Sequence, residues 1–237
     1  MVTEEIIAKN NIRVQRFKDA TWFSPTNMPD VTIFGVGSLG SYLAFFLGRM
    51  DCKLHIVDFD SLEGLNSSAQ FYPIAYCKSR EPKVNSLRSW LDEFIGRDLS
   101  IEIENVKVDD SYILSSPIVF SCFDNMAARK ILFSKWLELE SRELFIDLRA
   151  NMEEFSVFIV QKNVNEQRYL DEFFDDSALP DLPCSLKSTS HCSAMCASIA
   201  TGLFTNYLSN KNMKEDLRDL PFSTKISIPI SLYETNY

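Results

Sequence analysis

The ten residues VTIFGVGSLG, at positions 31–40, decide how this chain folds. A short strand of the buried type leads directly into a loop that holds three of the chain's seven glycines, and apolar residues at helical spacing begin at Ser41. Glycines at Gly35, Gly37 and Gly40 allow a tight turn and a close approach of the backbone to a phosphate. The free N–H groups of the following helix attract the same anion. The loop therefore predicts nucleotide binding, with a purely structural strand-to-helix turn as the alternative.

Short apolar strands and helical patterns alternate through the rest of the chain. The patterns predict strands at 54–57, 101–104, 117–122, 144–148, 155–160 and 223–230, and helices at about 41–50, 82–95, 125–140 and 192–208. Such alternation is typical of βαβ units around a parallel sheet. We expect an α/β fold, doubly wound, with a mainly parallel sheet and helices on both faces.

The length of 237 residues fits one domain over residues 1–237. Within it we expect an N-terminal arm (1–30), a core (31–160), a crossover loop (175–191), and a buried helix with a C-terminal strand (192–237). The last helix is apolar nearly all round, which predicts burial.

The composition excludes several classes of protein. The chain is 46% hydrophobic and 24% charged, as in globular proteins, and not in disordered or collagenous ones. Its net charge of −9 argues against nucleic-acid binding, which needs clustered Lys and Arg. We expect no secretory signal and no membrane span, because no apolar run is long enough. Six cysteines without paired spacing indicate free thiols, and hence a cytoplasmic protein.

A dense polar series follows the second predicted strand. Asp58 lies eighteen positions after Gly40, where a carboxylate can accept hydrogen bonds from a ribose, as in nicotinamide enzymes. The series then continues with Asp60, Glu63, Asn66 and Gln70. A dehydrogenase has no use for these further polar residues, so a nicotinamide-dependent oxidoreductase is disfavoured.

This series resembles the ThiF/MoeB/ubiquitin-activating superfamily of ATP-dependent adenylyltransferases, whose pattern is Asp-x-Asp-x-Val-Glu-x-x-Asn-x-x-Arg-Gln. Residues 81–84 resemble the family's Lys-Pro-Lys-Val segment, and residues 121–129 resemble its Asp-Asn pair followed by a helix with an Arg. The resemblance covers roughly residues 31–160 and implies a Rossmann-like fold. Residues 17–23 and 124–129 resemble the compact single-domain branch found in bacterial mobile elements and phages.

The resemblance implies ATP and Mg²⁺ as cofactors and a role for each matched residue. Asp58 would hold the ribose hydroxyls, and Lys83 would supply a point charge to the triphosphate. Asp124, at the end of a strand, would hold Mg²⁺; an N-cap for the next helix is its alternative role. The remaining matched positions would contact the nucleotide: Asp60, Asn66, Gln70 and Asn125.

The implied reaction is attack by a protein C-terminal carboxylate on the α-phosphorus of ATP, with release of pyrophosphate. The implied partner is a ubiquitin-like or sulfur-carrier protein with a Gly-Gly-type C-terminus. Positioning and charge neutralisation do most of the chemical work in such a step.

The chain departs from the family pattern at Ala69, where the family has Arg. Arg13 or Arg16 of a neighbouring subunit would replace it, since dimeric relatives supply such a residue in trans; a homodimer is therefore expected. Arg80 and Arg129 are the alternatives within the chain. Without a replacement, the protein is a catalytically impaired scaffold that binds a nucleotide or a partner.

The family's zinc tetrad of two Cys-x-x-Cys pairs is also missing. Cys192 and Cys196 share a helix face near His191, but small buried core residues are the favoured interpretation, and no structural zinc is expected. After adenylation, many relatives transfer the activated carboxyl group to a cysteine. Cys184 lies in the corresponding loop, where Lys187 and His191 would lower its pKa; a loop that only covers the nucleotide is the alternative. Cys192 is the second candidate.

Overall fold

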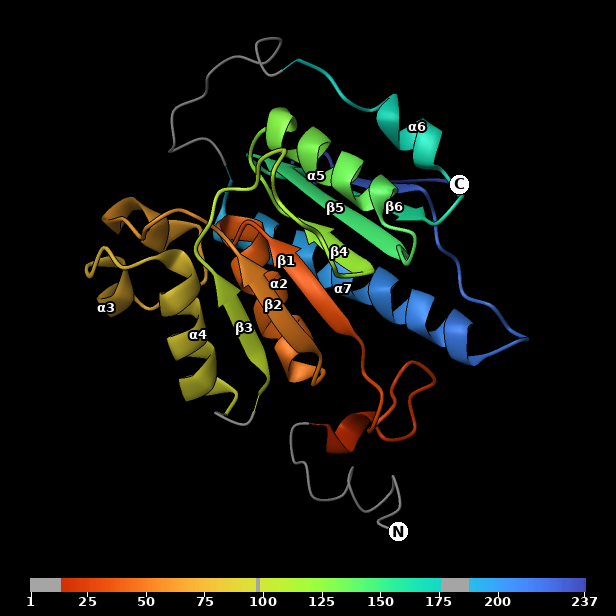
Figure 1. The fold of residues 1–237 in the computed structure, drawn as a ribbon, viewed down its shortest axis with the longest axis horizontal. Helices are drawn as coiled ribbons and strands as arrows, with labels where there is room; N and C mark the ends of the chain where they lie inside the picture. The colour runs from red at the N-terminus through yellow and green to blue at the C-terminus, as the bar shows by residue number, and fades with distance from the viewer. Residues whose placement is uncertain (1–13, 97–98, 176–187) are drawn as a thin grey trace.

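The structure is a computed structural model that describes residues 14–96, 99–175 and 188–237. Its described part contains one eight-stranded sheet with the order β3-β2-β1-β4-β5-β6-β7-β8 (Figure 1). Strands β3, β2, β1, β4 and β5 are parallel to their neighbours, and β6, β7 and β8 continue the sheet in antiparallel pairs. The strands are β1 (Asp30–Phe34), β2 (Lys53–Val57), β3 (Ile101–Glu104), β4 (Ile118–Ser121), β5 (Leu144–Asn151), β6 (Glu154–Gln161), β7 (Ser223–Ser227) and β8 (Leu232–Asn236).

Helices cover both faces of the sheet. On one face, α2 (Ser38–Arg49), α4 (Lys83–Phe94) and α7 (Ser190–Asn212) pack against the larger buried cluster of the core. On the other face, α5 (Met126–Glu138) and α6 (Glu166–Leu170) pack against a second cluster rich in aromatic rings (Figure 1). Three short turns complete the described chain: η1 (Gln15–Phe17), η2 (Gly64–Ser68) and α3 (Ile74–Cys77). The doubly wound, Rossmann-like α/β fold predicted from the sequence is confirmed.

Several details differ from the sequence prediction. Pro82 caps α4 instead of opening it. Helix α7 is buried on the sides that meet the sheet and α2, but Met195, Ser198 and Gly202 form an exposed stripe, so it is not buried all round. The predicted last strand ends at Ser227 and is followed by β8, an exposed edge strand whose pattern was missed.

None of the helices in the described ranges is long and apolar enough to cross a membrane. Five of the six cysteines lie in the described ranges, and all five are buried free thiols. Cys52, Cys77 and Cys122 pack in the hydrophobic core. Cys184 lies outside the described residues.

The register of the parallel strands determines where polar residues meet. Phe34, at the end of β1, pairs with Val57 of β2 on one side and with Ser121 of β4 on the other. The chain runs from β1 to β2 and β3 on one side and returns to β4 on the other. The residues that follow β1, β2 and β4 therefore lie together at the C-terminal edge of the sheet, where the strands end. This is the switch point at which doubly wound folds bind ligands.

Candidate functional site

The glycine loop joins β1 to α2 and is shaped by contacts with β4. Gly35 has a φ of +82°, and a Cβ there would lie 2.9 Å from the carbonyl oxygen of Cys122. A Cβ at Gly40 would lie 2.0 Å from the carbonyl oxygen of Gly35. Close packing therefore explains these two glycines. Gly37 differs, because a Cβ there would meet only Gln70 Nε2, at 3.9 Å. A ligand that approaches the loop closely explains this third glycine better than packing does.

Asp58 ties the segment after β2 to the glycine loop. Its Oδ2 accepts a hydrogen bond of 2.7 Å from Val36 N, and its Oδ1 accepts one of 2.7 Å from Asp60 N. Asp58 is 7% exposed, and burial raises the pKa of its carboxyl group, although nearby Lys83 and the two backbone N–H groups act in the opposite direction. The side chain therefore orders the loop in the absence of any ligand.

Lys83, the first residue of α4, reaches the same edge. Its Nζ lies 2.7 Å from Asp60 Oδ2, and its own N–H donates to the carbonyl oxygen of Asp60. Lys83 is buried, whereas the Asp60 side chain is about half exposed. An ammonium group carries three protons, so Lys83 can donate to a phosphate while it stays paired with Asp60.

The end of the polar series lies beside the loop. Gln70 Oε1 is buried and has no hydrogen-bond partner among the described residues, and Gln70 Nε2 faces Gly37. A buried polar atom without a partner is costly, which indicates a place for a ligand. Asn66 lies in η2, but its side chain is outside the described part of the structure. Ala69 is partly buried just before Gln70.

Asp124 and Asn125 follow β4, and both are exposed. Asn125 Oδ1 accepts a hydrogen bond of 2.8 Å from Ala128 N, so Asn125, and not Asp124, is the N-cap of α5. The N-cap role considered for Asp124 is therefore corrected. Asn125 Nδ2 also donates to Asp124 Oδ1, at 3.2 Å. The Asp124 carboxylate keeps acceptor positions that face solvent and are available to a cation.

Arg129 is buried behind this turn. Its guanidinium group is paired with Asp147 and donates to the carbonyl oxygens of Phe123 and Leu148. Asp147 is fully buried and also accepts a bond of 2.6 Å from Arg149 Nε. Burial by itself would raise the pKa of Asp147, but the two guanidinium groups hold it below the ordinary value. Arg129 is thus committed to structure and does not replace the Arg that is absent at position 69.

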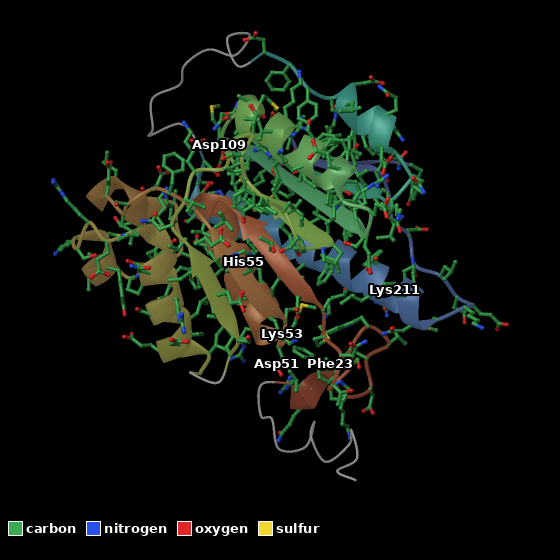
Figure 2. The ribbon with its side chains drawn as sticks, in the orientation of Figure 1. Phe23, Asp51, Lys53, His55, Asp109 and Lys211 are labelled. Atoms are coloured by element: carbon green, nitrogen blue, oxygen red, sulfur yellow. The ribbon has the colours of Figure 1, made fainter. Side chains whose placement is uncertain are left out.

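Arg16 lies in η1 and is exposed. This turn packs through Phe17 against Phe23. Figure 2 shows Phe23, Asp51 and Lys53 at the same end of the sheet, where β2 begins. The glycine loop and Asp58 lie at the other end of the strands. Arg16 is therefore remote from the site of its own chain, and Arg13 lies outside the described residues.

The structure describes only some of the residues proposed for the step at a cysteine. Cys184 and Lys187 lie outside the described residues. Cys192 is buried, its Sγ lies 3.8 Å from the carbonyl oxygen of Glu154, and burial raises its pKa to about 11. His191 is exposed and bonds to Glu153 at 3.1 Å. Within the described ranges, no group of three or more His, Cys, Asp or Glu residues is arranged to hold a metal ion.

Two buried hydroxyl groups at the site were missed in the sequence. Tyr72 OH donates to the carbonyl oxygen of Val36 at 2.8 Å. Ser41 Oγ donates to the carbonyl oxygen of Gly37 at 2.7 Å and accepts from Phe71 N at 2.9 Å. In the sequence, Tyr72 comes two residues after Gln70 and Ser41 comes directly after Gly40, and these positions were the features that pointed to them.

The ThiF family model matches residues 9–215 of the chain. The chain belongs to the ThiF family. Among solved structures, the ThiF-family chain described here is similar to selenomethionine PaaA, with a TM-score of 0.70 and 16% identity over 99% of this chain and 73% of that one. It is also similar to E. coli MccB with AMPCPP and selenomethionine MccA, with a TM-score of 0.70 and 11% identity over 97% and 72% of the two chains.

A third similar structure is the microcin C7 biosynthetic enzyme MccB in complex with N-formylated MccA. Its TM-score is 0.70, at 12% identity, over 97% of this chain and 73% of that one. At these identities the structures show a shared fold. Among curated protein sequences, no match was found.

Proposed function

We propose that this ThiF-family chain is an ATP-dependent adenylyltransferase that activates a carboxylate of a protein or peptide. The observation that carries the proposal is the convergence at one sheet edge of the glycine loop, the Asp58–Asp60–Lys83 cluster and the exposed Asp124. The similar MccB structures were determined with ATP, with AMPCPP and with MccA, which supports a nucleotide and a polypeptide as the two ligands.

The residues present fit a bound nucleotide. The open space at Gly37 and the unpartnered Gln70 Oε1 suit a phosphate and a hydroxyl group that approach the loop. Lys83 would neutralise charge on the phosphates, and Asn66 would contact the nucleotide from η2. Asp58 would accept a ribose hydroxyl through the acceptor capacity that its two backbone bonds leave unused.

Asp124 is the proposed ligand of Mg²⁺, with Asn125 fixed beside it as the cap of α5. Hard cations prefer oxygen ligands such as this exposed carboxylate. When bound, Mg²⁺ would neutralise charge on the phosphates. In the reaction, an oxygen of the substrate carboxylate forms a bond to the α-phosphorus while the bond from that phosphorus to the pyrophosphate oxygen breaks.

The finer parts of the proposal concern partners. We propose a Gly-Gly-type C-terminus of a ubiquitin-like or sulfur-carrier protein as the substrate. As the next step we propose that the Cys184 sulfur attacks the carbonyl carbon of the acyl adenylate, so that a thioester forms and AMP is released. Since Arg16 is exposed and remote from the site of its own chain, we propose that a homodimer supplies it to the partner's site, in a cytoplasmic protein.

Pyrophosphate exchange tests the reaction. With small candidate proteins ending in Gly-Gly present, the protein should exchange labelled pyrophosphate into ATP, and Asp124→Ala should abolish the exchange. Asp110→Ala is the matched control, because Asp110 is an exposed aspartate that follows β3 near the same edge. Cys184→Ala should leave exchange intact but remove any thioester adduct on a non-reducing gel.

The second candidate function is a scaffold that binds a nucleotide or a partner without catalysis. Ala69 favours the scaffold, because the family's Arg, which would stabilise the phosphate charge, is absent from this position. ATP binding without exchange, with every candidate substrate, would establish the scaffold and reject the enzyme.

A further inference from the structure

Val36 lies between two glycines of the loop, and side chains from other segments hold both polar groups of its backbone. Its N–H donates to Asp58 Oδ2 at 2.7 Å, and its carbonyl oxygen accepts from Tyr72 OH at 2.8 Å. Neither contact is local, since the partners lie 22 and 36 residues away. Asp58 thus holds the peptide unit between Gly35 and Val36, and Tyr72 holds the next one, between Val36 and Gly37.

Tyr72 is suited to this contact because its hydroxyl group is sequestered. The side chain is 6% exposed, and the hydroxyl lies between the carbonyl oxygen of Val36 and that of Lys83, which is 3.5 Å away. A hydroxyl group has one proton to donate, so the shorter contact is the dominant bond. Burial and the nearby charge of Asp58 raise the pKa of Tyr72 well above its usual value, so the proton is retained.

Peptide planarity transfers this restraint to Gly37. In a trans peptide unit, the carbonyl group of one residue and the N–H of the next lie in one plane and point in opposite directions. Tyr72 binds the carbonyl oxygen of Val36 and thereby directs the Gly37 N–H away from itself. Ser41 Oγ binds the next carbonyl oxygen, that of Gly37, and is itself held by Phe71 N, one residue before Tyr72.

We propose that Tyr72 is a positioning residue that fixes the Gly37 N–H in the direction needed to donate to a phosphate of the bound nucleotide. The identity of the ligand rests on the proposed function. In this role Tyr72 acts on the nucleotide through the Val36–Gly37 peptide, whose carbonyl oxygen it holds. The segment after the polar series thus holds the loop in two ways: directly through Tyr72 OH, and through Phe71 N, which donates to Ser41 Oγ of α2.

Tyr72→Phe tests the proposal, because it removes one hydroxyl group and keeps the buried ring. Two quantities are measured on the full chain: the ¹⁵N order parameter of Gly37 without ligand, and the affinity for Mg-ATP by calorimetry. We expect the order parameter of Gly37 to fall while that of Gly202 in α7 stays constant. We also expect the Kd to rise roughly 3- to 10-fold, the effect of one lost hydrogen bond. Tyr76→Phe, which removes a hydroxyl group bound to Glu93, is the control and should change neither quantity.

The KM for ATP and kcat, measured separately, distinguish a positioning role of Tyr72 from a general loss of structure. In pyrophosphate exchange, Tyr72→Phe should raise the KM for ATP and leave kcat within twofold, because the lost contact serves ground and transition states alike. An unchanged order parameter, or a looser loop with an unchanged Kd, would overturn the proposal. If the unaltered protein does not bind ATP, the proposed function fails, and the order parameter of Gly37 still decides whether Tyr72 fixes the peptide.

Discussion

The ends of β2 and β4 carry the two aspartates on which the site depends, and they are built in opposite ways. Asp58, after β2, is 7% exposed and each of its oxygens accepts a backbone N–H. Asp124, after β4, is exposed, and its Oδ1 accepts a hydrogen bond from the Asn125 side chain. Both oxygens of the first aspartate are tied into the fold, which leaves a ligand only their remaining acceptor capacity, whereas the second aspartate is open to solvent. Proximity at one sheet edge therefore does not give two carboxylates the same role.

The ion pairs at the two strand ends also differ in burial. The β2 end is stabilised by the pair of buried Lys83 with half-exposed Asp60. The β4 end rests on the buried Arg129–Asp147 pair, in which Arg129 is committed to Asp147. Substitutions should therefore affect folding at Asp58 and Arg129, and chemistry at Asp124.

The largest effect on stability is expected for Arg129→Ala. This change removes one of the two cations of the buried Asp147 and the donor to the Phe123 carbonyl oxygen. Breaking a buried pair typically costs about 3 to 5 kcal/mol of unfolding free energy. Urea denaturation measures it, with exposed Lys130→Ala as the control. A cost below about 1 kcal/mol would show that Arg149 alone satisfies Asp147.

Asp58→Ala should come next. It leaves the N–H groups of Val36 and Asp60 without their acceptor, and one unsatisfied buried donor costs about 1 to 3 kcal/mol. We expect a loss of about 2 to 3 kcal/mol in urea denaturation at pH 7. If Asp58→Ala unfolded at the same urea concentration as the unaltered protein, the loop would not depend on this carboxylate.

A smaller effect is expected in the pH dependence of stability. Because the folded-state pKa of Asp147 is lowered, its contribution is fully present above the ordinary aspartate pKa and is lost as the pH falls through the lowered value. The urea midpoint of the unaltered protein should therefore fall between pH 5 and pH 3, and the decrease should be shallower in Asp147→Asn. Parallel pH profiles would assign the acid sensitivity to other carboxylates.

Asp124→Ala should have the smallest effect on folding. An exposed side chain without a buried partner usually contributes less than about 0.5 kcal/mol. The variant should unfold at the same urea concentration as the unaltered protein and keep α5, which Asn125 caps. A loss of about 1 kcal/mol or more would mean that Asp124 has a structural role like that of Asp58.

The β1 and β2 region could be predicted from the sequence because its spacing is local. The glycines follow β1 and Asp58 follows β2, and a parallel register brings these strand ends to one edge. Lys83 begins α4, and only the resemblance of residues 81–84 to the family segment pointed to it. The β4 end could be predicted only in outline. Both Asp124 and Asn125 are suitable N-cap residues, so the sequence does not decide which of them caps α5. The burial of Arg129 depends on Asp147, eighteen residues later.

Two further features could not be read from the sequence at all. Strand β8 has exposed side chains throughout, so it shows no alternation of apolar and polar residues. The Tyr72 contact joins segments 36 residues apart and has no spacing rule. Both depend on tertiary structure, which local propensity does not encode.

The most direct test of the central claim is the melting temperature of the purified protein with Mg-ATP and, separately, with NAD. A ligand at 100 times its Kd stabilises the native state by about 2.7 kcal/mol, which corresponds to a rise of roughly 5 to 10 °C for a chain of this size. The account predicts that rise with Mg-ATP and none with NAD. A rise with NAD and none with Mg-ATP would contradict the assignment of the glycine loop, Asp58 and Lys83 to an ATP site.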